Sequence, residues 1–299
     1  MLKIRVKYFV RALRSAFLPA SALPFVLGSL LARERFDLMN FSLGFFAVTF
    51  THLSANLTND WADSKSGLDW KDKKFYKFFG GSKLIQEGVF SENFYFIFLA
   101  AFALLAAVLI SLLSWNLKDP SILFIYSAIM FFAWSYSARP LQLAYRRMGE
   151  AVIFILFGPA LVMGGYFIQT RIFPDVKSLV VSLPVGFLIT AVLFANEVPD
   201  YNQDTASGKL TWVSFLGERR SYIIYALLIS CAFISIAAGI AKGFIGKTAI
   251  LSFILLFPAI KAARILKGSS SKEGYIRSSK LTILVHNLVT VILILSVVL

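Results

Sequence analysis

Nine stretches of about twenty mostly apolar residues, divided by shorter polar segments, restrict this chain to few folds. A helix needs about 20 apolar residues to cross the hydrocarbon core of a bilayer. Within that core every backbone N–H and C=O needs a partner inside the protein, so helices are the favoured spanning element. We therefore predict an all-α membrane protein whose spans cover residues 15–33, 39–58, 93–115, 119–137, 150–169, 177–198, 221–241, 246–266 and 280–299.

The distribution of basic residues predicts how the chain is oriented. The formal net charge of +14 would by itself suggest a nucleic-acid partner. However, if the N-terminus is cytoplasmic, 23 of the 30 Lys and Arg residues lie on the cytoplasmic side and 7 on the other. This is the positive-inside bias of membrane proteins. We therefore expect a multi-pass protein of the cell membrane, in contact with the bilayer and with no nucleic-acid partner.

Two features limit other interpretations. The single cysteine, Cys231, allows neither a disulfide framework nor a cysteine-based metal site. The segment Met1–Arg14 is basic and leads into an apolar run, as a signal peptide does. Since that run is long, contains prolines and precedes eight more spans, we expect it to be the first helix and not a cleaved leader.

Two clusters of Asn and Asp lie 140 positions apart, each at the end of a predicted span on the cytoplasmic side. Spacings of three and four place side chains on one helix face, so each cluster forms a polar stripe. Carboxylates near lipid are costly and mark functional sites. Mg²⁺ prefers oxygen ligands and is commonly bound together with substrate phosphates. The stripes are Asn56, Asn59, Asp60 and Asp63, and Asn196, Asp200 and Asp204.

Basic and aromatic residues near the stripes point to the same chemistry. Lys83 follows a Gly-Gly pair, and Lys209 follows the second stripe. Carboxylates together with such cations suit a metal–diphosphate complex, where the cations also stabilise a leaving diphosphate. Tyr136 and Tyr145 flank Arg139, and aromatic rings can stabilise a developing carbocation. We therefore predict a membrane-embedded enzyme acting on a diphosphate.

At these residues the chain resembles the UbiA-type intramembrane prenyltransferases. Their first signature, roughly N-x-x-N-D-x-x-D, is matched by residues 56–63. The second, roughly N-x-x-x-D-x-x-x-D-x-x-x-G-K, is matched from Asn196 to Lys209. The resemblance implies a single domain over residues 1–299, with nine helices around a central cavity. It also implies a cytoplasmic cap made by segments 60–92 and 199–220.

Several segments are similar to the 1,4-dihydroxy-2-naphthoate branch of that superfamily. Gly67 and Asp69 stand where that branch has a G-x-D ending, and residues 80–88 resemble its G-G-S-R-V-I-Q-x-G run, with Lys for Arg. Residues 136–146 resemble Y-S-x-P-P-x-x-L-x-Y-R, with Arg139 in place of a proline. Glu197-Val198-Pro199 stands where the branch has a basic N-N-x-R-D segment. The acceptor therefore stays open between a naphthoate, a benzoate and a glyceryl phosphate.

The resemblance implies transfer of a polyprenyl chain from its diphosphate to an aromatic acceptor, as in menaquinone biosynthesis. Mg²⁺ would be held by Asn56, Asp60, Asp63, Asn196, Asp200 and Asp204. Asn59, Asp69, Lys83, Lys209 and Tyr145 would bind substrate, and Tyr136 and Arg139 would join the metal-binding carboxylates in catalysis. A cation-coupled transporter is the alternative from another class. Prenyl chain length and oligomeric state are not determined by the sequence.

The prenyl tail leads to one more expectation. A long apolar chain cannot lie under a polar cap, so its binding site should run between helices toward lipid. Segments 93–115 and 119–137 are candidates for one wall, because Phe131, Phe132 and Trp134 precede Tyr136.

Overall fold

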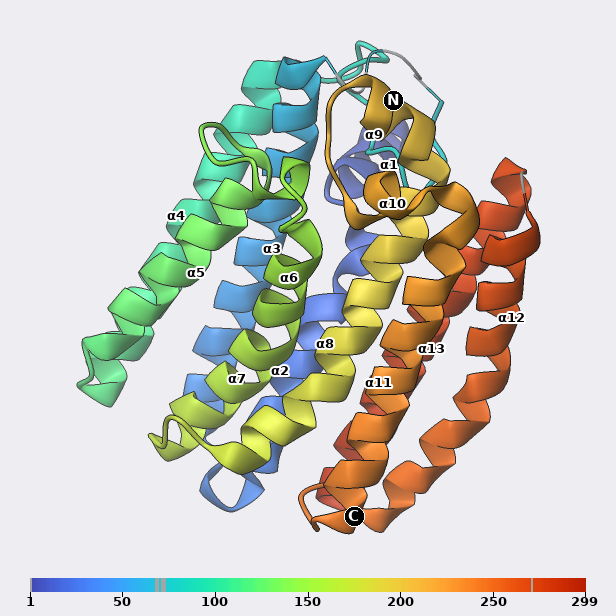
Figure 1. The fold of residues 1–299 in the computed structure, drawn as a ribbon. Coiled ribbons are helices and arrows are strands. Elements are labelled where there is room, and N and C mark those ends of the chain that lie inside the picture. Colours follow the sequence, from blue (N-terminus) through green and yellow to red (C-terminus); the bar gives the residue numbers. More distant parts are fainter. Residues whose placement is uncertain (1, 68–69, 71–73, 270) are drawn as a thin grey trace.

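The computed structural model describes residues 2–67, 70, 74–269 and 271–299. Over these ranges the regular structure is helical, apart from one isolated β-bridge between Arg146 and Leu210. The long helices run side by side along one common direction (Figure 1). The all-α prediction is therefore confirmed for the described part of the chain.

The helices vary widely in length, and several are joined through short 3₁₀ or π turns. In chain order they are α1 (Leu2–Ala12), η1 (Ser15–Phe17), α2 (Pro19–Leu31), η2 (Arg33–Arg35), α3 (Leu38–Ser66), α4 (Glu92–Leu117), α5 (Ser121–Ser137), η4 (Leu143–Tyr145), α6 (Gly149–Ile155), η5 (Leu156–Ala160), α7 (Leu161–Thr170), α8 (Val176–Glu197), η6 (Val198–Asp200), α9 (Tyr201–Ala206), α10 (Trp212–Leu216), η7 (Glu218–Arg220), α11 (Ser221–Ala241), η8 (Lys247–Leu255), α12 (Leu256–Gly268) and α13 (Lys272–Val298).

The predicted count of nine spans is not reached. Among the described residues, seven helical stretches are long and apolar enough to cross a membrane. An eighth is obtained if the pair Val6–Ala12 and Ser15–Leu31, bent by 49°, is one broken span. α5 is apolar but shorter, at 17 residues. Hydropathy along the sequence did not reveal the bend or the start of α5 at Ser121, two residues later than predicted, and these account for the difference.

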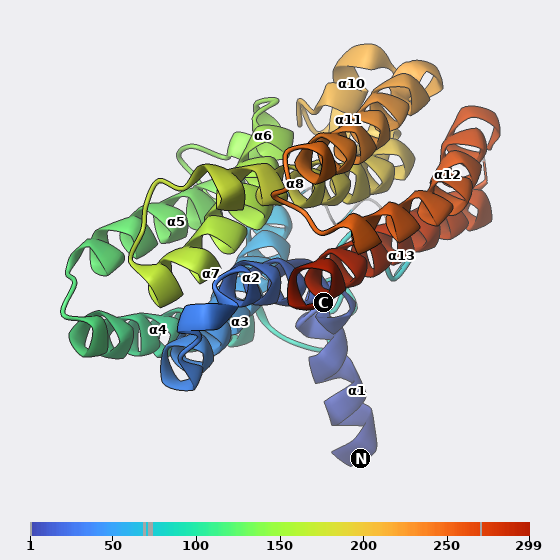
Figure 2. The ribbon, with the colours of Figure 1, turned by 90° about the horizontal axis from the view of Figure 1, so that it is seen from below.

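Helix α8 occupies the middle of the bundle. Seen from below, α4 and α5 stand at one side, α12 and α13 at the other, and α1 projects away from the rest (Figure 2). α8 packs against α2, α6, α7, α11 and α13. Of the 18 consecutive residues that form the apolar stretch of this span, 72% are buried inside the protein, against 17% for α4. The residues at the end of α8 are therefore held on the most enclosed helix of the fold.

Glycines bring α2 and α7 into close contact. A Cβ added at Gly28 would lie 2.0 Å from the backbone oxygen of Val162, and one at Gly165 would lie 2.5 Å from that of Phe25. Small residues that allow backbones to approach are a common device for packing helices in membranes. This contact fixes the position of α2, whose N-terminal end borders the site described next.

The outer surface is suited to lipid. Trp115, Phe124 and Phe257 are 86%, 76% and 76% exposed. Polar groups lie in the interior, and some are paired there, as in the hydrogen bond of 2.8 Å between the hydroxyls of Tyr225 and Thr282. An apolar exterior around a partly polar interior is the arrangement of a multi-pass membrane protein.

Candidate active site

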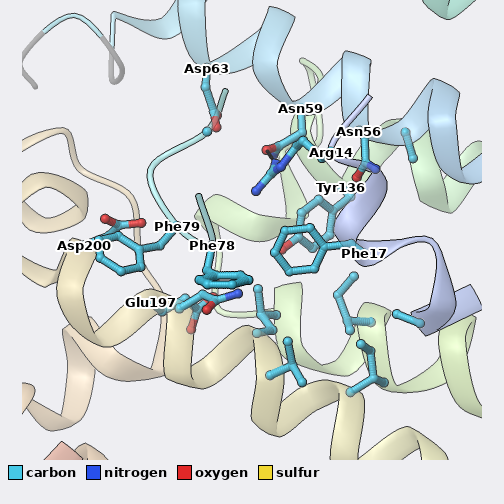
Figure 3. Close-up of a pocket in the computed structure, with 18 of the residues that line it drawn as sticks. Arg14, Phe17, Asn56, Asn59, Asp63, Phe78, Phe79, Tyr136, Glu197 and Asp200 are labelled. Atoms are coloured by element: carbon cyan, nitrogen blue, oxygen red, sulfur yellow. Dashed lines mark hydrogen bonds between the residues drawn. The ribbon is translucent and has the colours of Figure 1, made fainter. Parts of the chain in front are cut away.

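A cavity of about 210 Å³ lies between α3, α5, α8 and the segment that holds Phe78 to Gly81. One end is polar, and the other is lined by Ile153, Leu156, Phe157 and Ile189. Both predicted stripes contribute to the polar end (Figure 3). The predicted site residues that line the cavity are Asn56, Asn59, Asp63, Tyr136, Asn196, Asp200, Asp204 and Lys209.

The first stripe lies on α3, which continues beyond the predicted span to Ser66. The amide of Asn56 donates to the backbone oxygen of Leu13 at 3.1 Å. That of Asn59 donates to the Ser137 hydroxyl at 2.8 Å. The two asparagines therefore join α3 to the α1–α2 bend and to the end of α5.

Asp63 ends the first stripe and is paired with Tyr145. The Tyr145 hydroxyl donates to Oδ1 of Asp63 at 2.6 Å. Burial, together with the Asp63 carboxylate, raises the pKa of Tyr145 well above its usual value. Tyr145 therefore remains a neutral donor, and it positions Asp63 although it does not itself line the cavity.

The second stripe continues through Pro199. α8 ends at Glu197, a 3₁₀ turn carries the chain through Pro199, and α9 begins at Tyr201. Proline fits the first turn of a helical segment because its missing N–H has no intrahelical acceptor there. Asn196, Asp200 and Asp204 thus all reach the cavity.

Lys209 is the cation of the second stripe. Its Nζ lies 3.4 Å from Oδ2 of Asp204. Burial by itself would lower the pKa of Lys209, but the carboxylates of Asp204 and Asp63 outweigh burial and raise it well above its usual value. Lys209 therefore carries a positive charge into the cavity wall at every physiological pH.

The segment around Gly80 links the two stripes. The Gly80 N–H donates to Oδ2 of Asp200 at 3.1 Å, and the Ser82 N–H donates to the Asp60 carboxylate at 3.3 Å. Gly80 and Gly81 both have φ of +73°, a conformation that glycine adopts without strain. Asp60 was predicted to face the cavity, but it is 2% exposed and lies behind this segment.

Two more predicted residues lie away from the cavity lining. Lys83 is buried at 1% exposure within the same segment. Arg139 is exposed in the turn that follows α5, so the structure does not bring it together with the stripes. Asp69 lies outside the described residues.

Sequence reasoning missed Arg14. This residue stands between α1 and η1 and lines the cavity. Its Nη1 donates to Oδ1 of Asn59 at 3.0 Å and lies 3.7 Å from Oδ1 of Asp60. Figure 3 shows it beside Asn59. The available signal was its position just before the first span, at the membrane level of the first stripe.

Two glutamates were also missed. Glu197 is 6% exposed and lines the cavity one helical turn before Asp200. Glu150, at the start of α6, is 1% exposed and accepts the Trp212 N–H at 2.8 Å. The two carboxyl groups lie close enough to influence each other. No donor among the described groups is bonded to Oε2 of Glu197.

A second, apolar cavity of about 140 Å³ adjoins the first. It lies between α3, α4, α5 and α7 and includes Ile110, Leu113 and Ile129. The predicted walls from segments 93–115 and 119–137 do contribute to it. The aromatic residues named for that wall do not, because Phe131, Phe132 and Trp134 are 52%, 45% and 43% exposed on the outer surface. The cavities share five lining residues: His52, Ala55, Ala133, Leu156 and Phe157.

The polar end is chemically suited to a hard cation that is shared with a ligand. Its wall presents carboxylate and amide oxygens, and Oδ1 of Asn196 is buried without a hydrogen-bond partner among the described groups. Within the described ranges, no three Asp, Glu, His or Cys side chains are grouped closely enough to hold a metal ion alone. Mg²⁺ usually completes its shell with water and substrate phosphates. The residues therefore fit Mg²⁺ bound jointly with a phosphorylated ligand.

Known proteins show the same sequence pattern and fold. The pattern of the UbiA prenyltransferase family matches residues 21–284. The chain is 25% identical over 261 residues to the 1,4-dihydroxy-2-naphthoate octaprenyltransferase of Bacillus subtilis (strain 168), which covers 86% of this chain and 80% of that protein. It is 30% identical over 230 residues to UbiA prenyltransferase domain-containing protein 1 of Dictyostelium discoideum, with coverages of 75% and 68%.

A solved structure agrees with these sequence relationships. The fold is similar to that of a UbiA homolog from Archaeoglobus fulgidus bound to DMAPP and Mg²⁺, with a TM-score of 0.65. The identity is 16%, and the match covers 95% of this chain and 99% of the other. The family pattern extends over most of the chain and includes both polar stripes. This chain therefore belongs to the UbiA prenyltransferase family.

Proposed function

We propose that this enzyme transfers a polyprenyl chain from its diphosphate to an aromatic acceptor, with Mg²⁺ as its cofactor. The observation that carries the proposal is the polarity of the cavity. Carboxylates, amides and two cations line one end, and an apolar region continues into a second cavity. A prenyl diphosphate has the same division between its charged head and its apolar tail.

Asp63, Asp200 and Asp204, with Asn56, Asn59 and Asn196, would hold Mg²⁺ and the diphosphate. When bound, Mg²⁺ neutralises charge on the diphosphate and so makes it a better leaving group. Arg14, beside the first stripe, and Lys209, beside the second, add fixed positive charge at this end of the cavity. Such preorganised charge favours departure of the diphosphate with its electron pair.

Tyr136 and the apolar wall would protect the carbon centre that forms. Tyr136 lines the cavity at the end of α5, and its ring face can attract a developing allylic cation. Phe17 and Phe78, which meet edge to face with ring centroids 6.5 Å apart, also line the cavity. Excluding water prevents hydrolysis of the cation before the ring carbon of the acceptor attacks it.

Two further features belong to the proposal. We place the polar end of the cavity at the cytoplasmic face of the cell membrane, following the charge bias of the sequence. We also propose that segments 60–92 and 199–220 of this single domain act as a cytoplasmic cap. Residues 78–81, Gln203 and Lys209 line the cavity from these two segments and support this role.

The relatives favour a naphthoate as acceptor, and the test is a direct assay. Purified protein is incubated with Mg²⁺ and a prenyl diphosphate, and prenylated product and released diphosphate are measured with a naphthoate, a benzoate and a glyceryl phosphate. Product with the naphthoate alone supports the full proposal. Release of diphosphate without any prenylated acceptor would contradict it, and a transporter would show neither.

A further inference from the structure

Glu197 has no place in the mechanism above, although it lines the same cavity. Along α8 and α9 the lining residues follow in order: Leu193, Asn196, Glu197, Asp200 and Asp204. Glu197 therefore stands at the boundary between the apolar wall and the carboxylates that face the diphosphate. This is the level at which the first carbon of a prenyl chain and the ring of its acceptor must meet.

The Glu197 side chain is unusually costly to keep there. Only 6% of Glu197 is exposed, and no donor among the described groups forms a hydrogen bond with its Oε2. A buried acceptor that lacks a donor costs about 1–3 kcal/mol, so such groups require a reason. One of its neighbours, Glu150, is another carboxyl group whose own Oε1 already accepts the Trp212 N–H.

The cations of the cavity are paired with other groups, although the charge of Lys209 also acts on Glu197. Lys209 pairs with Asp204 at 3.4 Å, and Arg14 interacts with Asn59 and Asp60. The wall at Glu197 thus offers oxygen acceptors in need of a hydrogen-bond donor.

We infer that Glu197 binds a hydroxyl group on the ring of the aromatic acceptor. The inference rests on the proposed function, since it assigns the ring to this level of the cavity. A phenolic O–H donates to the Glu197 carboxyl, which holds the ring beside the reactive carbon of the donor. This bond also increases electron density in the ring, as attack on an allylic cation requires. The required acceptor class is a phenol or aromatic diol, and the hydroxyl is the group recognised.

The test pairs a protein change with a matched ligand change. Equilibrium binding of 1,4-dihydroxynaphthalene and of its dimethyl ether is measured on wild type, Glu197→Leu and Glu197→Gln, with Mg²⁺ and a non-reactive prenyl diphosphate analogue present. Wild type should prefer the diol by about fivefold or more, as expected for one buried hydrogen bond. Glu197→Leu should lose this preference and bind the ether as wild type does. Glu197→Gln retains an acceptor oxygen and should recover most of the preference.

Controls separate recognition from folding and from the reaction. Glu34→Leu changes an exposed glutamate outside the cavity, in η2, and should bind both ligands as wild type does. Affinity for the prenyl diphosphate analogue should stay within about twofold in Glu197→Leu. Equal weakening of diol and ether, or loss of analogue binding, would overturn the inference. Because binding is measured without turnover, a positive result together with no product in the transfer assay would contradict only the proposed function.

Discussion

The backbone N–H of Gly80 donates to Oδ2 of Asp200 at 3.1 Å, across 120 positions of the sequence. Two residues later the Ser82 N–H donates to Asp60, so one short segment contacts both polar stripes. The carboxylates therefore do not depend on a metal ion alone to hold their relative positions.

Asp204→Asn should reduce prenyl transfer by about a hundredfold or more, since it removes a charged group from the diphosphate end of the cavity. The measurement is diphosphate release over a range of Mg²⁺ concentrations. Asp119→Asn is the matched control, because Asp119 pairs with Arg171 at the other end of the bundle. Wild-type rates in Asp204→Asn would exclude this carboxylate from the site.

Arg14→Gln should raise KM for the prenyl diphosphate by about tenfold, with a smaller effect on KM for the acceptor. The reason is that Arg14 supplies one of the two cations of the cavity lining. Arg11→Gln serves as control, because Arg11 pairs with Glu87 and does not line the cavity. Equal kinetics in both variants would show that Arg14 contributes only to structure.

Ala133→Phe should select against long donors. Ala133 is shared by the two cavities, so a large side chain there narrows the passage between them. Relative kcat/KM is compared for prenyl diphosphates of one to four isoprene units. We expect a loss that grows with chain length, whereas Phe132→Ala, on the exposed side of α5, should leave the profile unchanged. A loss independent of length would mean that the tail lies elsewhere.

The charge of Lys209 predicts how one part of the stability of the protein depends on pH. Its folded pKa is raised well above the usual value, chiefly because nearby carboxylates outweigh burial. The stability gained from this shift is fully present below the unfolded pKa of about 10.4 and is lost as pH rises through the folded value. Between about pH 6 and 9 the charge of Lys209 should therefore stay constant. Thermal melting should therefore show a lower Tm for Lys209→Met than for wild type throughout this range.

The helical spacing of Asn and Asp was enough to predict the two stripes and the cavity end that they share. It could not decide between Asp60 and Asp63, because both lie three to four residues from Asn56 or Asn59 and only packing sets the rotation of α3. Arg14 escaped prediction because its position depends on the 49° bend and on its left-handed backbone, with φ of +50°. Arg139 was predicted to join the site, but it lies on an exposed turn after α5. The course of that turn depends on contacts with distant parts of the chain, which the local sequence does not reveal.

The burial of α8 has a consequence for how this protein can change over generations. α8 contacts five other α-helices, and 72% of its apolar stretch is buried, so most substitutions there would disturb packing. In α4 only 17% of the corresponding stretch is buried, so one lipid-facing residue can replace another. A deep mutational scan should therefore find α8 the least tolerant long helix and α4 among the most tolerant. Sequence changes that alter the acceptor or the prenyl chain length are then expected mainly on the helices around α8, while the sequence of α8 itself changes little.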